Sequence, residues 1–293
     1  MAWKRPRLTH AGRFGCFRRS LPRIRRCVLL PTARRRSVRL TVLADNFRIA
    51  SNIVQRDVKI LFSDSFLVAI MFANFAIDLF VTAATFGRLV PPSSGIPDYF
   101  KFIAPGSNFV TCSVAAFQSG RDIWRERYIK DLTSYLLSLP ASRRLWSVSR
   151  VAGGVARSLI ATFPGTLTIC YLYGILLDPR ILGAFSIVGL FSLGVVGISM
   201  AVSAYASSIE VFVTVRSTVQ LYFSFFSTLF FSPDVFPSFL RPIVLANPMT
   251  WAVEAFRQLS KPGVGLGPAS VLVVPSLAFA ALGTIVYLYH NQL

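Results

Sequence analysis

Long apolar stretches are the feature that most limits what this chain can fold into. They cover residues 66–86, 102–119, 155–177, 182–206, 213–231 and 270–289. Each is close to the roughly 20 residues that an α-helix needs to cross the hydrocarbon core of a bilayer. Lipid offers the backbone no hydrogen-bond partners, so runs of this length favour helices and exclude a closed β-barrel. We therefore expect an all-α integral membrane protein with six transmembrane helices.

The charge distribution predicts the orientation of these helices. Arg and Lys are dense before residue 66 and within 121–157, and sparse within 87–101, 178–181 and 232–262. Basic loops remain on the cytoplasmic side, so both termini should be cytoplasmic in a multi-pass protein of the cell (plasma) membrane. The net charge of +19 indicates contact with membrane lipids through their anionic headgroups, and no nucleic acid is expected as a partner. Arg157 and Arg216 are expected to anchor helices at the inner surface.

The N-terminal segment differs from the rest of the chain. Residues 1–44 contain no Asp or Glu and carry clustered arginines. Such a composition fits a transit peptide, a lipid-binding arm or sequence upstream of the true start. We expect residues 1–50 to form a basic, disordered cytoplasmic tail or targeting segment, and residues 51–293 to form the membrane domain. A transit peptide would place the protein in an organelle membrane instead.

The segment 232–257, between the last two apolar stretches, predicts a re-entrant helical hairpin between helices 5 and 6. Four prolines make it too broken to cross a bilayer twice, yet it is too apolar for a solvent loop. Asn247 is a good N-cap, and Pro248 stands where a first helical residue should be. Glu254 and Arg257 are spaced for an ion pair one turn apart. Because a carboxylate near lipid needs a partner, Glu254→Ala is expected to reduce function more than Asn247→Ala.

A second informative segment, residues 120–150, predicts an amphipathic helix at the inner surface. Its apolar residues recur at helical spacing up to Pro140, while Glu126 with Lys130 and Arg127 with Asp131 form i,i+4 pairs on the opposite flank. Two interpretations remain open: an interfacial anchor, or a docking surface for a partner.

Candidate chemistry is sparse. The four cysteines and two histidines are scattered without metal-ligand spacing, so neither a catalytic nor a metal or cofactor site is expected. Asp78 lies inside the first apolar stretch, where it faces either a pore or the outer headgroups.

Two motifs resemble the permeases of ABC-2 type transporters. ERYIKDLTSYLLSLPASRR is similar to their inner loop, through Glu126, Arg127, Pro140, Ser142 and Arg143. NPMTWAVEAFRQL is similar to their segment before the last helix, through Asn247, Pro248, Thr250, Glu254 and Arg257. The order and spacing of both motifs match the family over about residues 50–293.

The resemblance implies a transmembrane subunit of an ABC exporter. ATP would be bound and hydrolysed by a separate cytoplasmic ABC ATPase subunit, since the chain has no GxxxxGK[ST] motif. Residues 120–143 would couple the two subunits, through Glu126, Arg127, Lys130, Asp131, Pro140 and Arg143. Two permeases would form the complete transporter, as a homodimer or with a second permease.

The sequence leaves the cargo and one other class open. Aromatic residues of the fifth stretch suit an amphipathic substrate, but they also suit plain packing against lipid, which is commoner. Drug-like, lipid-linked and polysaccharide cargoes therefore all stay open. The alternative is a secondary, ion-coupled transporter, which would need intramembrane carboxylates; Asp78 is the single candidate.

Overall fold

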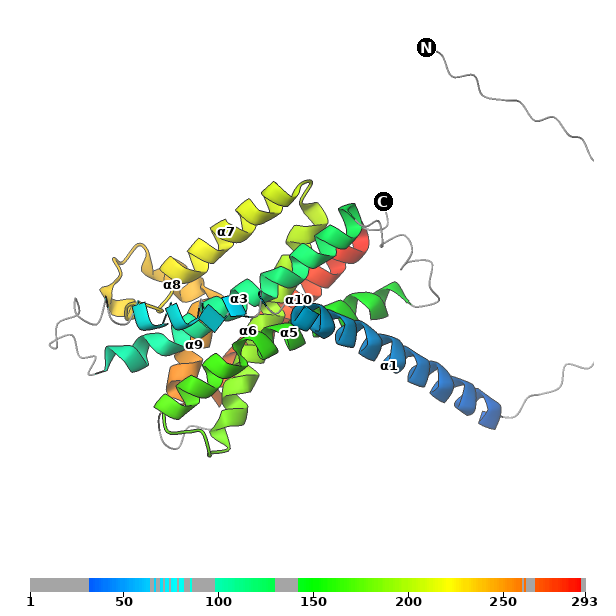
Figure 1. Ribbon diagram of the computed structural model, residues 1–293, viewed down its shortest axis with the longest axis horizontal. Helices are drawn as coiled ribbons and strands as arrows, with labels where there is room; N and C mark the ends of the chain where they lie inside the picture. Colours follow the sequence, from blue (N-terminus) through cyan, green and yellow to red (C-terminus); the bar gives the residue numbers. More distant parts are fainter. Residues whose placement is uncertain are drawn as a thin grey trace, which may run out of the picture. The chain divides into compact units, whose positions relative to one another are not determined.

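The computed structural model describes residues 32–63, 98–129, 142–259, 261 and 267–290, with isolated helical positions between 66 and 85. This described part is α-helical and contains no strand. Residues 1–42 and 43–293 form two separate units, and the helix bundle belongs to the second (Figure 1). The helices are α1 (Thr32–Ser63), α3 (Tyr99–Tyr128), α5 (Arg143–Leu172), α6 (Arg180–Tyr205), α7 (Ile209–Phe225), the 3-10 turn η2 (Pro233–Val235), α8 (Arg241–Ala246), α9 (Pro248–Gln258) and α10 (Gly267–His290).

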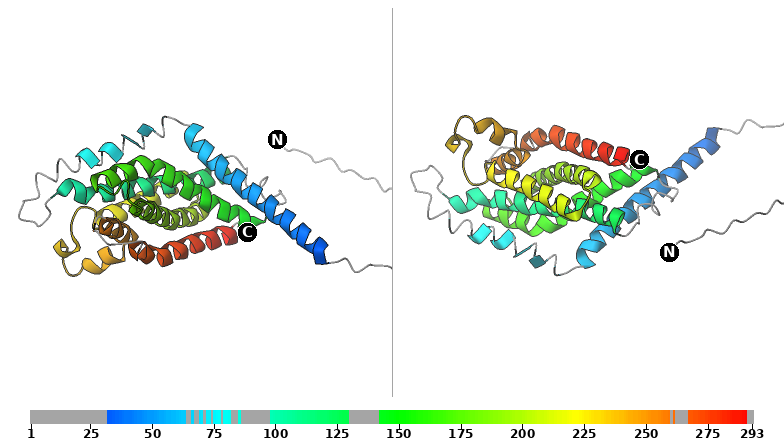
Figure 2. Two further views of the ribbon diagram at one scale, coloured as in Figure 1. Left: turned by 90° about the horizontal axis from the view of Figure 1, so that it is seen from below. Right: turned by 90° about the horizontal axis from the view of Figure 1, so that it is seen from above.

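Helix α6 is the centre of the bundle and packs against α3, α5, α9 and α10 (Figures 1 and 2). Glycines allow its two closest crossings. A Cβ at Gly197 would overlap the Phe279 carbonyl oxygen of α10, and a Cβ at Gly120 of α3 would lie 2.8 Å from the Ser199 carbonyl carbon of α6. Small residues therefore bring the backbones together within one chain, as is common between membrane helices.

Three of the described helices are long and apolar enough to cross a membrane: Arg143–Leu172, Arg180–Tyr205 and Ser270–His290. The stretch 66–86 falls largely outside the described residues. The stretch 102–119 lies within α3, and 213–231 overlaps α7, which ends at Phe225. The other three spans therefore stay a prediction.

Two predicted boundaries are corrected. Residues 120–128 do not form a separate surface helix, because α3 continues without a break from Tyr99 to Tyr128. Arg143 does not lie in a loop: it is the first residue of α5, which Ser142 caps by accepting a hydrogen bond from the Leu145 amide at 3.2 Å. The sequence did not reveal that α3 and α5 extend this far, because charged residues are typical of loops. Several of the charged residues in these two helices are buried instead.

Helix α1 begins at Thr32, inside the segment that we expected to be disordered. Residues 32–44 contain neither proline nor glycine, so nothing in them interrupts a helix.

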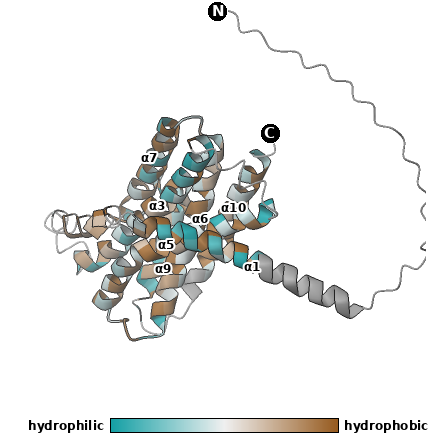
Figure 3. Cartoon of the chain, turned by 45° about the vertical axis from the view of Figure 1, so that its right-hand side comes forward, coloured by the Kyte–Doolittle hydropathy of each residue, from teal (hydrophilic) through white to brown (hydrophobic). Residues whose placement is uncertain are grey.

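Polar side chains of α3 face the inside of the bundle. Asn108 donates to the Thr166 hydroxyl of α5 at 3.0 Å, and Ser113 donates to the Gln220 side-chain oxygen of α7 at 2.8 Å. Large apolar side chains lie exposed on the outside, including Leu177, Val274 and Tyr171 (Figure 3). This inverted distribution suits a bundle surrounded by lipid and explains the low overall hydropathy of α3.

Candidate functional site

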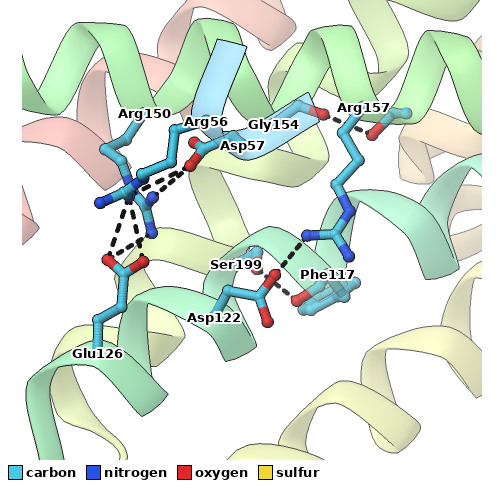
Figure 4. A network of polar contacts seen from close by, with 10 residues as sticks. Arg56, Asp57, Phe117, Asp122, Glu126, Arg150, Gly154, Arg157 and Ser199 are labelled. Atoms are coloured by element: carbon cyan, nitrogen blue, oxygen red, sulfur yellow. Dashed lines mark hydrogen bonds and ion pairs between the residues drawn. The ribbon is translucent and has the colours of Figure 1, made fainter. Parts of the chain in front are cut away.

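Six charged residues from three helices form a buried network in the bundle (Figure 4). Helix α1 contributes Arg56 and Asp57, α3 contributes Asp122 and Glu126, and α5 contributes Arg150 and Arg157. The spacings of four residues in α3 and seven in α5 put each pair on one helical face. Three positive and three negative charges balance within the network.

Arg150 is the central member. It is 2% exposed, its Nη1 lies 2.7 Å from Asp57 Oδ1, and its Nη2 lies 3.1 Å from Glu126 Oε2. Arg56 approaches the same two carboxylates, at 3.2 Å from Asp57 Oδ1 and 3.1 Å from Glu126 Oε1. The two arginines and two carboxylates therefore form a closed ring that ties α1 to both α3 and α5.

A second ion pair lies beside this ring. Arg157, which is 4% exposed, donates from Nη1 to Asp122 Oδ2. The Arg157 guanidinium points into the bundle toward α3 and not into solvent (Figure 4). That Arg157 anchors α5 at the inner surface stays a prediction.

Two consecutive glycines make room for the network. A Cβ at Gly153 would lie 2.6 Å from Asp57 Oδ2, and a Cβ at Gly154 would lie 2.8 Å from the Ser119 hydroxyl oxygen. The glycines thus let α1 and α3 approach α5 closely enough for direct ion pairs.

The energetics of such a site are asymmetric. Burying charged groups costs free energy that their mutual attraction only roughly offsets, whereas removing one member leaves its partner buried and uncompensated. Loss of one member should therefore destabilise the packing of α1, α3 and α5, and each carboxylate of the network has an arginine partner. Within the described residues no cluster of His, Cys, Asp and Glu could hold a metal ion.

The structure describes only some of the predicted coupling residues, and it places those in different surroundings. Lys130, Asp131 and Pro140 lie outside the described residues, as does the pore candidate Asp78. Glu126 does not lie on an exposed flank: it is 7% exposed and contacts Arg56 and Arg150. The other two described members remain closer to solvent. Arg127 lies 5.2 Å above the Tyr128 ring, and Arg143 is exposed at the start of α5.

The hairpin segment contains the two predicted short helices, α8 and α9, and its local contacts are confirmed. The Asn247 side chain accepts a hydrogen bond from the Met249 amide at 2.9 Å, with Pro248 as the first residue of α9. Arg257 Nη1 lies 2.9 Å from Glu254 Oε1. That this hairpin enters the membrane stays a prediction.

Asn247 does more than the sequence indicated. It is fully buried, and its Nδ2 donates to the carbonyl oxygens of Tyr222 at 3.0 Å and Phe226 at 2.7 Å. One side chain therefore satisfies the end of α7 and the beginning of α9 together.

These contacts predict how the two hairpin variants differ in stability, while the expected order of their effects on function stays a prediction. Asn247→Ala should lower the free energy of unfolding by about 1–2 kcal/mol, since it removes a helix cap and the Asn247 donor to the Phe226 carbonyl, whereas the Tyr222 carbonyl still accepts from the Phe226 amide. Glu254→Ala should cost about 0–1 kcal/mol, because its carboxylate is 40% exposed and Arg257 keeps its hydrogen bonds to Phe102 and Leu229. Thermal unfolding of both purified variants in detergent checks this. An equal or larger loss for Glu254→Ala would contradict the bridging role of Asn247.

The comparison with known families agrees with this architecture. The family model described as ABC-2 type transporter matches residues 50–260. The match covers well over half of the chain, which therefore belongs to the ABC-2 type transporter family, a family of membrane components of ABC transport systems. The chain is thus a multi-pass membrane protein of the transporter class. No curated protein matches the chain.

Most of the network was not predicted from the sequence. Arg56, Asp57, Asp122 and Arg150 were given no role, and Asp78 was taken as the single candidate carboxylate within the membrane. A signal was nevertheless present: Asp122 and Glu126, and Arg150 and Arg157, each recur on one face of a helix rich in small or apolar residues.

Proposed function

We propose that the chain is the permease subunit of an ATP-driven exporter, working with a separate cytoplasmic ABC ATPase. The observation that carries this proposal is the charge network that joins the last turn of α3 to the first turns of α5 (Figure 4), in a chain of the ABC-2 family. Glu126 lies two residues before the end of α3, and Arg150 lies two turns into α5. A force applied to residues 130–141 would reach both helices directly.

The proposed coupling divides the predicted residues into two roles. Lys130, Asp131, Pro140 and Arg143, with Arg127, form the docking surface for the ATPase. Glu126, Arg150 and Asp57 pass the movement of the docked link to α1, because rigid helices joined by a buried ion network move together. ATP binds to the ATPase, and this chain contributes no catalytic residue.

We further propose how the complete transporter is assembled. Two copies of this permease form a homodimer around the cargo path, with both termini cytoplasmic in the plasma membrane. The hairpin of α8 and α9 enters the membrane from the outer side and closes the path there. The aromatic residues of α7 fit an amphipathic, drug-like, lipid-linked or polysaccharide cargo moving outward.

Two variants test the division between docking and coupling. Lys130→Glu should weaken ATPase retention about fivefold in pull-downs from native membranes, because it reverses a charge at the proposed contact. Glu126→Gln, which keeps the shape of the side chain, should leave retention unchanged and lower cargo-stimulated ATP hydrolysis and export.

The outcomes separate the alternatives. Wild-type permease that captures no ATPase would overturn the proposed function and favour an ion-coupled carrier. Glu126→Gln that releases the ATPase as readily as Lys130→Glu would show docking through Glu126 and refute its transmission role. Arg48→Gln, in α1 and outside the docking surface, is the matched control for the loss of one charge.

A further inference from the structure

Helices α3 and α7 enclose a pair of arginines that the transport function does not explain. The two helices pack together, and Ser113 donates to the Gln220 side-chain oxygen of α7 at 2.8 Å. Trp124 Nε1 donates to the carbonyl of Ala206, which caps the end of α6 shortly before α7, at 2.9 Å. Arg121 lies between Ser113 and Trp124 in the sequence, and Arg216 lies between Ala206 and Gln220. Both side chains are partly buried, and Arg121 acts electrostatically on Arg216.

This pair has no acidic partner among the described residues. The nearest carboxylates of α3, on Asp122 and Glu126, are committed to the network with α1 and α5. Glu210 precedes Arg216 by six residues and so lies on a different side of α7. Arg125, one turn beyond Arg121, is exposed and adds a third positive charge on the same face of α3.

An apolar groove lies between α6 and α7, on the helix that carries Arg216. It is formed by Ala201, Val202, Tyr205, Ala206, Val211 and Val215, with a volume of about 260 Å³. Val215 directly precedes Arg216, so the groove between α6 and α7 begins on the neighbouring face of the helix that carries the charge.

We propose that this surface is a binding site for an anionic membrane phospholipid. The lipid phosphate lies between Arg121 and Arg216, and one acyl chain lies in the α6–α7 groove. Two half-buried guanidinium groups repel each other, and a phosphate that accepts bidentate hydrogen bonds offsets that repulsion. Lipid is the committed source, because the adjacent groove is apolar and a membrane protein is surrounded by phospholipid at high local concentration.

Lipid retention by the purified full-length chain tests the site. The protein is delipidated in mild detergent, exposed to equal amounts of phosphatidylglycerol and phosphatidylcholine, and examined by native mass spectrometry. Wild-type protein should retain phosphatidylglycerol preferentially. Arg121→Gln and Arg216→Gln should each lower its affinity about fivefold, as expected for one basic group at an anionic surface.

Matched variants separate this site from general charge and from misfolding. Arg144→Gln removes one exposed charge elsewhere and should lower affinity less than twofold. Arg216→Lys keeps the charge and should retain most of the binding, while thermal unfolding confirms that each variant is folded. Equal retention of both lipids by wild-type protein, or equal losses for Arg144→Gln and Arg216→Gln, would overturn the proposal.

A soluble competitor distinguishes the source of the phosphate. Glycerol phosphate lacks acyl chains, so it should fail to displace phosphatidylglycerol at equal concentration. Displacement by glycerol phosphate would show that the arginines bind a soluble anion and would refute the lipid assignment.

Discussion

Arg150→Ala is expected to lower the free energy of unfolding by about 3–5 kcal/mol, the usual cost of breaking a buried ion pair. Arg150 is 2% exposed and holds both Asp57 and Glu126. Without it the two carboxylates share Arg56 alone, whose side chain is already 34% exposed. Two buried negative charges would then face one partly solvated positive charge. Thermal unfolding of the purified protein in detergent measures the loss.

Arg144→Ala is the matched control for this prediction. Arg144 is exposed, lies in the same helix and loses the same atoms, so its replacement should change stability by no more than about 0.5 kcal/mol. Arg150→Lys keeps one charge but not the planar fork, and should fall between the two. Equal stability of the two alanine variants would mean that the network contributes nothing to holding the helices together.

Local signals in the sequence predicted local structure well. The apolar stretches indicated an all-α membrane protein, and Asn247 with Pro248 correctly marked the beginning of α9. The Glu254–Arg257 pair followed from its spacing alone. In each case the interacting groups are neighbours along the chain, so propensity and periodicity contain the relevant information.

Contacts between distant segments could not be predicted in the same way. Asp57 and Arg150 are separated by 93 positions, and nothing in either local pattern names the other. Charged residues usually lie at the surface, so Glu126 and Arg157 were placed there. Their burial depends on three helices meeting, with Gly153 and Gly154 providing the space, which is a property of packing and not of any single segment.

The second large effect on stability is expected where α6 crosses α10. Gly197→Ala is expected to lower the free energy of unfolding by about 1–3 kcal/mol, because overpacking forces a well-packed contact apart. The new methyl group would overlap the Phe279 carbonyl oxygen and lie 2.6 Å from Ala280 Cα. These obstructing atoms belong to the backbone of α10, which cannot move aside as a flexible side chain can.

Gly189→Ala makes the same chemical change in the same helix and isolates the steric cause. A methyl group there would meet only the side chain of Leu159, with Cδ2 at 3.9 Å and Cδ1 at 4.0 Å, which are ordinary van der Waals contacts. Alanine favours helix over glycine by up to about 1 kcal/mol, so this variant should be unchanged or more stable. Opposite signs for the two substitutions, measured by thermal unfolding in one detergent, would locate the effect in the α6–α10 contact. If Gly197→Ala were as stable as Gly189→Ala, the two backbones would have to lie farther apart than in this bundle, and the position of α10 against the central helix would be wrong.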